Sequence, residues 1–149
     1  MQPSNAKVMQ LSESMREVVR KFRCLDIAIA HQPHGELSIP EVHVIEYLGD
    51  KGVCMMRELA EYLLVAVNTI TSIVDKLEEK RFVRRERDDS DRRIVMVRLT
   101  DRGNEAYLGI MDKRLSSCRT LLTPLNEDEQ DIFMVLIRKI ARSSSTDKE

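Results

Sequence analysis

The stretch from Arg57 to Thr100 reads RELAEYLLVAVNTITSIVDKLEEKRFVRRERDDSDRRIVMVRLT, and it decides the fold. Two short helical patterns come first, and two arginine-rich segments with alternating apolar residues follow them. Residues Asp88 to Asp91 separate these two segments and are of types that favour turns. Two helices followed by a basic β-hairpin form the layout of a winged helix-turn-helix, which is the fold that the sequence predicts.

The second helical pattern, expected over residues 67–80, has one apolar and one polar face. Its apolar residues between Ile70 and Leu77 follow helical spacing and should be buried. The opposite face holds short polar and charged side chains: Asn68, Thr69, Thr71, Ser72, Asp75 and Lys76. Serine, threonine and asparagine are poor helix formers, so their clustering at the start of a helix needs a functional reason. Hydrogen-bonding groups at this end of a helix suit the reading of base edges in the major groove of DNA.

The hairpin, predicted from strands over residues 82–87 and 93–99, concentrates positive charge. Arginines flank its turn at Arg84, Arg85, Arg87, Arg92 and Arg93. Residues 81–102 contain eight arginines against five acids, while the whole chain has a net charge of −1. One reading is a solvated loop with its own ion pairs. The position directly after a polar-faced helix favours a wing in a narrow minor groove, with Asp91 orienting a neighbouring arginine side chain.

Helical patterns also precede and follow this stretch. Apolar residues recur from Val8 to Ile29 in alternating steps of three and four, which predicts one long helix. Its apolar seam packs either on the core or across a subunit boundary. Ser38 and Glu41 form a capping box that begins the next helix. Two more helices should follow Thr100 and Pro124.

The predicted fold class is therefore mainly α with a small β-hairpin wing. We expect a single winged-helix domain over residues 1–149, with a DNA-binding lobe over about residues 38–100. Helices over residues 7–32 and 101–143 should flank this lobe.

Several other classes are disfavoured. No apolar run approaches the roughly 20 residues of a membrane span, and no signal-peptide pattern begins the chain, so we expect a cytoplasmic protein without a membrane partner. Glycine-rich phosphate loops, GxSxG and HExxH are absent from the sequence. We therefore expect neither an enzyme nor a cofactor.

Histidines and cysteines give weaker signals. Three histidines do not supply a convergent ligand set, so no metal site is expected. Cys24 lies beside apolar seam positions and close to Arg20, Lys21 and Arg23. Positive neighbours can lower a thiol pKa, so Cys24 is either a small buried hydrophobe or a redox-sensing thiol.

With these residues in view, the chain resembles the MarR family of bacterial transcription regulators. The resemblance rests on Glu58-Leu59-Ala60, the threonine-rich helix ending in Asp75-x-Leu77-Glu78, Val83-Arg84-Arg85, Asp91-Arg92-Arg93 and Leu99-Thr100-x-x-Gly103. It implies a dimer whose first and last two helices intertwine, so that the helices over residues 7–32 and 101–143 serve dimerisation. It further implies palindromic double-stranded DNA, with the helix at 67–80 in the major groove and the hairpin in the minor groove.

By position, the resemblance implies that Asn68, Thr69, Thr71 and Ser72 face bases or phosphates. Arg92 would be the wing-tip arginine, with Asp91 and Arg93 shaping the loop. Many members of the family release DNA when a small phenolic or lipophilic molecule binds, and others respond to thiol oxidation.

Three residues depart from the family pattern. Met55 and Ala66 stand where a serine or threonine usually caps a helix, and loss of such a cap costs about 1 kcal/mol. Arg81 replaces a glycine at a position that often takes a left-handed conformation, at a cost of roughly 1 kcal/mol.

The sequence thus predicts a sequence-specific DNA-binding regulator, a repressor released by a small-molecule effector. Two alternatives stay open: a winged-helix module that binds protein, and a regulator triggered by oxidation of Cys24.

Overall fold

The computed structural model describes residues 2–32 and 35–143, and it leaves out the side chains of residues 22, 24–32, 35 and 36. The redox prediction for Cys24 therefore lies outside the described residues. The chain forms two compact units, one over residues 1–114 and the other over residues 115–149.

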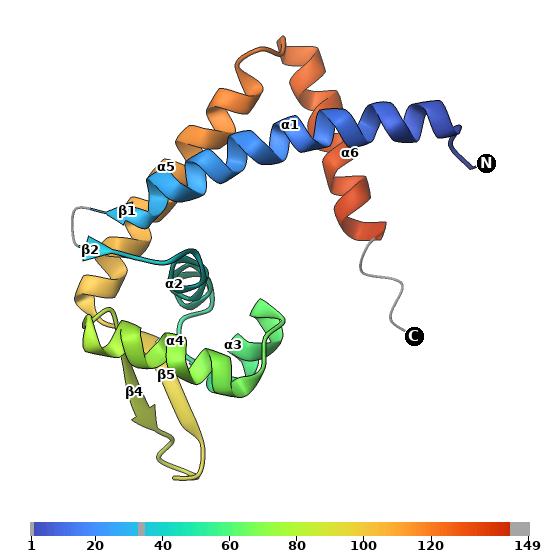
Figure 1. Cartoon of the computed structure of the whole chain (residues 1–149). Helices are drawn as coiled ribbons and strands as arrows, with labels where there is room; N and C mark the ends of the chain where they lie inside the picture. The colour runs from blue at the N-terminus through green and yellow to red at the C-terminus, as the bar shows by residue number, and fades with distance from the viewer. Residues whose placement is uncertain (1, 33–34, 144–149) are drawn as a thin grey trace. The chain divides into compact units, whose positions relative to one another are not determined.

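The order of elements confirms the predicted fold class, mainly α with a small β-hairpin wing (Figure 1). The helices are α1 (Asn5–Ala30), α2 (Ile39–Lys51), α3 (Met56–Leu63), α4 (Val67–Glu79), α5 (Asp101–Leu122) and α6 (Glu127–Ser143). The strands are β1 (His31–Gln32), β2 (Gly35–Glu36), β3 (Cys54–Met55), β4 (Val83–Arg87) and β5 (Val95–Leu99).

The wing belongs to a three-stranded antiparallel sheet in the order β3-β5-β4. The sequence did not predict β3, which has only two residues and precedes α3 directly. It pairs with the middle of β5, Cys54 opposite Val97, and so attaches the wing to the start of the helix-turn-helix. Beyond this pairing, β4 and β5 project from the helices as a hairpin in Figure 1.

The core of the first unit lies beneath α2, α3 and α4 and against the sheet. Its largest fully buried side chains include Ile45, Leu59, Ile70, Leu77 and Phe82. Ala106 and Ile110 of α5 complete the same cluster. Because α4 contributes Ile70, Val74 and Leu77 to this core, its opposite face is fixed in orientation toward solvent.

The predicted capping box at the start of α2 is confirmed and carries a buried charge. Ser38 Oγ accepts the Glu41 N–H at 3.4 Å, and Glu41 Oε2 accepts the Ser38 N–H at 2.6 Å. The Glu41 side chain is only 2% exposed, and both of its oxygens accept from Lys80 Nζ, at 2.9 and 3.0 Å. This ion pair joins the first turn of α2 to the residue that ends α4.

Burial alone would raise the pKa of Glu41, but hydrogen bonds from the Ser38 backbone and from Lys80 outweigh it, so the pKa lies below the ordinary value of 4.5. A depressed pKa in the folded state means that the ionised carboxylate stabilises the fold above pH 4.5. That contribution is lost as the pH falls through the folded pKa.

Glu41→Gln should therefore lower the free energy of unfolding by about 2 kcal/mol at pH 7, since the amide loses the charge-assisted bonds to Lys80. Below the folded pKa the wild-type carboxyl is itself neutral, so the two proteins should converge. Urea denaturation at pH 7 and in a series toward pH 3.5 measures the difference. A difference that is independent of pH would show that ionisation of Glu41 is not what stabilises this site.

The predicted absence of side-chain N-caps on α3 and α4 is also confirmed. Met55 and Ala66 occupy the N-cap positions, and neither side chain caps its helix. Glu58 compensates in part, because its Oε2 accepts the Met55 N–H at 2.6 Å. Arg81 adopts a left-handed conformation with φ of 64°. Leu64, in the turn between α3 and α4, is left-handed too, with φ of 55°, which the sequence did not indicate.

Candidate nucleic-acid interface

The polar face of α4 is exposed along its whole length. Every residue predicted for it is exposed: Asn68, Thr69, Thr71, Ser72, Asp75 and Lys76. Val67, the first residue of the helix, is apolar yet 52% exposed. The surface at the start of α4 is therefore a mixture of short polar groups and methyl groups.

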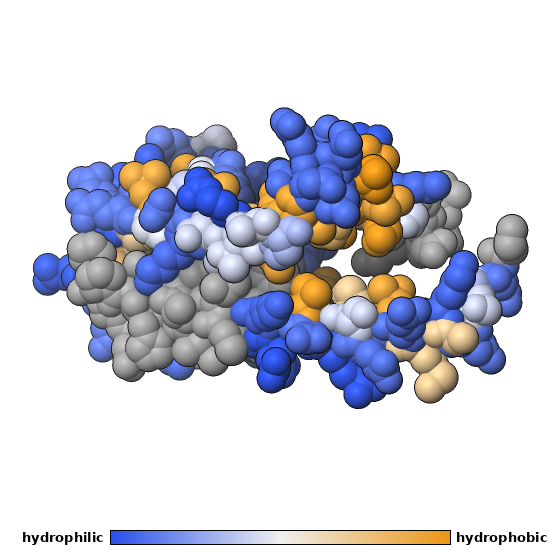
Figure 2. All heavy atoms as spheres, turned by 90° about the horizontal axis from the view of Figure 1, so that it is seen from above, coloured by the Kyte–Doolittle hydropathy of each residue, from blue (hydrophilic) through white to orange (hydrophobic). Residues whose placement is uncertain are grey.

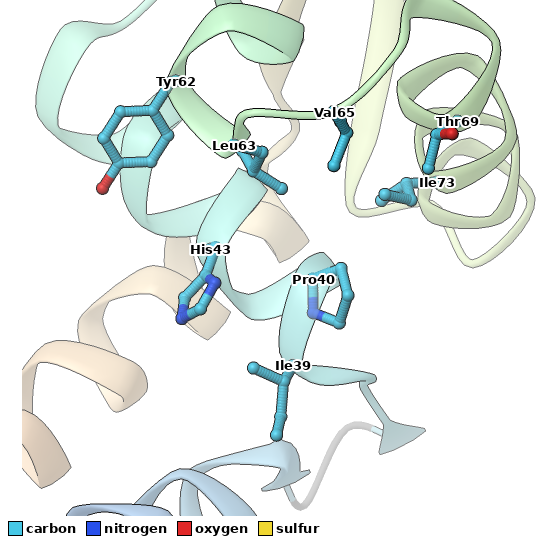
Figure 3. A pocket seen from close by; sticks show the side chains of 8 residues that line it. All are labelled: Ile39, Pro40, His43, Tyr62, Leu63, Val65, Thr69 and Ile73. Atoms are coloured by element: carbon cyan, nitrogen blue, oxygen red, sulfur yellow. The ribbon is translucent and has the colours of Figure 1, made fainter. Parts of the chain in front are cut away.

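The two threonines of this face present different groups. Thr71 Oγ1 donates to the Val67 carbonyl oxygen at 2.9 Å, so its hydroxyl hydrogen is used inside the helix. Thr69 instead borders a pocket, and Figure 3 shows its hydroxyl oxygen turned away from Ile39 and Pro40 on the other side of that pocket. Thr69 thus keeps its hydroxyl for a partner, whereas Thr71 has lost its donor.

The register of the wing separates its arginines between two faces. Arg84 lies opposite Arg98, and Arg85 opposite Val97, so these two pairs point to opposite sides of the hairpin. On the first side, Arg84 Nε lies 2.8 Å from Glu86 Oε1, and Arg98 is 3.6 Å from the other oxygen of the same carboxylate. Glu86 therefore offsets part of the positive charge on this side.

Arg85, on the second side, points to α4 rather than to solvent. Its guanidinium contacts Glu78 Oε2 at 2.5 Å and Asp75 Oδ1 at 2.6 Å, and its side chain is 24% exposed. Burial acts to lower the pKa of Arg85, but the bonds to Asp75 and Glu78 outweigh it and raise that pKa. The guanidinium of Arg85, which the sequence predicted to contact DNA, is thus paired with two carboxylates of α4. Arg85 joins the wing to that helix.

Asp88 organises the tip of the wing. Its Oδ1 accepts the Ser90 N–H at 2.8 Å and the Asp91 N–H at 3.1 Å, as well as the Ser90 hydroxyl. The hydrogen bond from the Ser90 side chain, followed by those from the Asp91 and Ser90 backbone, lowers the pKa of Asp88. This role was not predicted from the sequence, although an aspartate two residues before a serine in a turn is a signal for such a bond.

Asp91 orders the backbone of the tip and, among the described residues, forms no ion pair with an arginine side chain. Asp91 Oδ1 accepts the backbone N–H of Arg93 at 3.0 Å, and its backbone oxygen accepts from Ile94. Two residues separate donor and acceptor, so the short aspartate reaches the chain itself more readily than a long side chain. Asp91 shapes the loop on which Arg92 and Arg93 stand.

The tip therefore presents cations that are free to take a partner. Arg87, Arg92 and Arg93 are exposed, and none of them forms an ion pair with any residue that the structure describes. Lys76 on α4 is likewise exposed and without an ion pair among the described residues. Exposed positive charges on a hairpin and on a polar helix face are suited to a polyanion.

An open pocket of about 560 Å³ lies behind the start of α4 (Figure 3). Ile39, Pro40 and His43 of α2 form one wall, and Leu63, Val65 and Ile73 form the other. Tyr62 closes one side. This pocket could not be predicted from the sequence, because its walls come from three helices that are close only in the folded chain.

The candidates for other chemistry can also be placed. Among the described residues, no cluster of histidine, cysteine, aspartate or glutamate is suited to hold a metal ion. Cys54 is buried in β3, and burial first and Glu58 second raise the pKa of its thiol to about 11. Cys118 is exposed. No helix within the described ranges is long and apolar enough to cross a lipid bilayer.

Large apolar side chains also remain exposed on α1 and α6. The α1 residues belong to the predicted seam: Val8, Leu11, Met15 and Val18. The α6 residues form a stripe along that helix: Ile132, Phe133, Leu136, Ile137 and Ile140. Apolar side chains at the surface are visible in Figure 2. Stripes of this kind are typical of protein–protein interfaces.

Comparisons with known proteins show similarity to transcriptional regulators. The MarR family model matches residues 37–95. The transcriptional regulator YkoM of Bacillus subtilis is 34% identical over 99 residues, which are 66% of this chain and 64% of YkoM. The transcriptional repressor MdtR of the same organism is 27% identical over 109 residues, 73% of this chain and 70% of MdtR. The chain spans 64% and 62% of the length of its curated relatives YkoM and YfiV.

Solved structures share the fold over nearly the whole chain. A MarR family protein from Bacillus stearothermophilus has a TM-score of 0.86 at 21% identity and covers 97% of this chain and 100% of its own. FabT of Streptococcus pneumoniae, in a complex with DNA, has a TM-score of 0.83 at 18% identity, over 93% of this chain and 97% of its own. At these identities the similarity establishes the fold.

Proposed function

We propose that the chain is a member of the MarR family and a sequence-specific DNA-binding regulator that represses transcription as a homodimer. The observation that carries the proposal is the wing tip, where Asp88 and Asp91 order a loop that presents unpaired arginines. Arg85 attaches the same hairpin to α4 through Asp75 and Glu78, in the second half of the helix that carries the polar face.

In the proposed complex, α4 enters the major groove and the wing enters an adjacent minor groove. The negative charge of the phosphates and of the narrow minor groove is offset by four exposed cations: Lys76, Arg87, Arg92 and Arg93. Asn68, Thr69 and Ser72 offer hydrogen bonds to base edges. Arg84 is paired with Glu86, so we expect it to contribute less to DNA binding than the unpaired arginines of the tip. Arg85 is a positioning residue that fixes the angle between wing and helix.

We assign the lobe over residues 38–100 to DNA binding and the helices over residues 7–32 and 101–143 to dimerisation. The exposed apolar stripes of α1 and α6 support this division, since an interface would remove them from water. A two-fold dimer would bind a palindromic site with its two α4 helices about one turn of DNA apart, roughly 34 Å.

Such a regulator acts on the chromosome in the cytoplasm and catalyses no reaction. Its relatives are named as transcriptional regulators, and one of them as a repressor. A small phenolic or lipophilic effector would release the DNA. The pocket behind α4 supports that part of the proposal, because a ligand between His43 and Ile73 would lie against the helix that carries Thr69.

Arg92→Ala should weaken binding by about tenfold on every duplex sequence, because one contact to the DNA backbone is lost. The slope of log K against log salt should become shallower by about 1. Fluorescence anisotropy titrations over a range of salt concentrations measure both quantities.

Arg138→Ala is the matched control, since it removes an exposed arginine from α6 and should leave affinity and slope unchanged. An unchanged affinity for Arg92→Ala would place Arg92 outside the groove and refute the wing assignment.

A further inference from the structure

Two methyl-bearing side chains stand at the start of α4, where the proposed function requires contact with bases. Val67 is the first residue of the helix, and its apolar side chain is 52% exposed. A solvated first turn ordinarily carries a polar residue, and an exposed valine also has lower helix propensity than alanine. Residue 71 follows four positions later, on the same side of the helix.

The Thr71 side chain is held in one orientation. Its hydroxyl donates to the Val67 carbonyl at 2.9 Å, while its own carbonyl oxygen accepts from Arg85 Nη2 at 3.5 Å. Arg85 is in turn fixed by Asp75 and Glu78. The hydroxyl cannot donate to a base without breaking a bond inside the helix. The hydroxyl oxygen can still accept a hydrogen bond, and the γ-methyl is the apolar group that this side chain offers to a partner.

In the major groove, the feature that suits an exposed methyl group is the C5-methyl of thymine. We propose that Val67 and Thr71 form a methyl-reading pair, which selects operators with thymine at the positions facing the first turn of α4. This inference rests on the proposed function and adds to it, because it assigns Thr71 to apolar contact rather than to hydrogen bonding. Asn68, Thr69 and Ser72 keep the polar part of the recognition.

Deoxyuridine tests the contact directly, because it differs from thymidine in duplex DNA only by that methyl group. A duplex is first selected from a random library with the full chain. Each thymine of one half-site is then replaced by deoxyuridine, and affinities are measured. We expect a loss of about fourfold at one or two positions, the value of one buried methyl.

Two variants of Thr71 separate its methyl from its hydroxyl. Thr71→Ser keeps the hydroxyl and the bond to Val67 but lacks the methyl, so it should bind thymine and uracil duplexes equally at one position. Thr71→Val keeps the methyl and lacks the hydroxyl, so it should retain the preference for thymine. Val67→Ala should lose the preference at a neighbouring position. Arg92→Ala serves as control, since it should weaken both duplexes by the same factor.

Two results would overturn the inference while leaving the proposed function intact. One is binding that no uracil substitution weakens. The other is a thymine preference that survives in Thr71→Ser and disappears in Thr71→Val, which would assign the reading to the hydroxyl. If the wild-type chain selects no duplex at all, the proposed function itself fails and the inference with it.

Discussion

Leu136→Arg is expected to convert the proposed dimer into monomers and to weaken binding to a palindromic site by at least about a hundredfold. Leu136 is 52% exposed at the centre of the apolar stripe of α6. In a dimer the new guanidinium would be buried without a partner, which costs several kcal/mol. A monomer holds only one half-site, so the gain from simultaneous binding of two lobes, typically 10² to 10⁴, is lost.

Sedimentation velocity measures the oligomeric state, and titration of the same samples with duplex DNA measures the affinity. Asp131→Arg is the matched control, because it places the same side chain on the opposite, polar side of α6 and should remain dimeric. A Leu136→Arg protein that still sediments as a dimer would refute the assignment of this stripe to the interface.

Gly103→Ala is expected to lower the free energy of unfolding by about 3 kcal/mol, the range found for overpacking in a rigid core. A Cβ at this position would stand 2.0 Å from the Phe82 carbonyl oxygen. That oxygen is held in place because it accepts the Thr100 N–H at 3.1 Å, while the Thr100 hydroxyl donates to the adjacent Arg81 carbonyl oxygen at 2.6 Å. The better helix propensity of alanine, about 1 kcal/mol, is too small to compensate.

Thermal unfolding followed by circular dichroism should show a midpoint lower by roughly 10 °C for a chain of this size. Glu105→Ala, an exposed change two residues further along α5, should shift the midpoint very little. A Gly103→Ala protein as stable as wild type would mean that α5 does not pack against the turn after α4 as closely as described.

Much of the fold could be predicted because its signals are local. The faces of α4 follow from the spacing of Ile70, Val74 and Leu77, and the capping box of α2 from two residues three positions apart. The left-handed conformation of Arg81 follows from its place in a family pattern that usually has glycine there.

What the sequence could not show depends on contacts between distant residues. Glu41 and Lys80 are far apart in the chain, and nothing in either neighbourhood indicates their buried ion pair. In the sequence, Arg85 is one of several basic residues in a run. Only the strand register shows that its side chain faces Asp75 and Glu78. In the same way, the sequence marks Thr71 as polar, and only its bond to Val67 shows that its donor is already used.

The central claim is that the lobe over residues 38–100 binds DNA through the wing and α4. The most direct test is to titrate the wild-type chain against DNA from upstream of its own gene at several salt concentrations. We expect tight binding with a log–log slope of about −5 or steeper, as six or more phosphate contacts require. An unrelated duplex of the same length should bind at least about a thousandfold more weakly. A slope near zero, or equal and weak binding to both duplexes, would contradict the proposal and favour a module that binds protein.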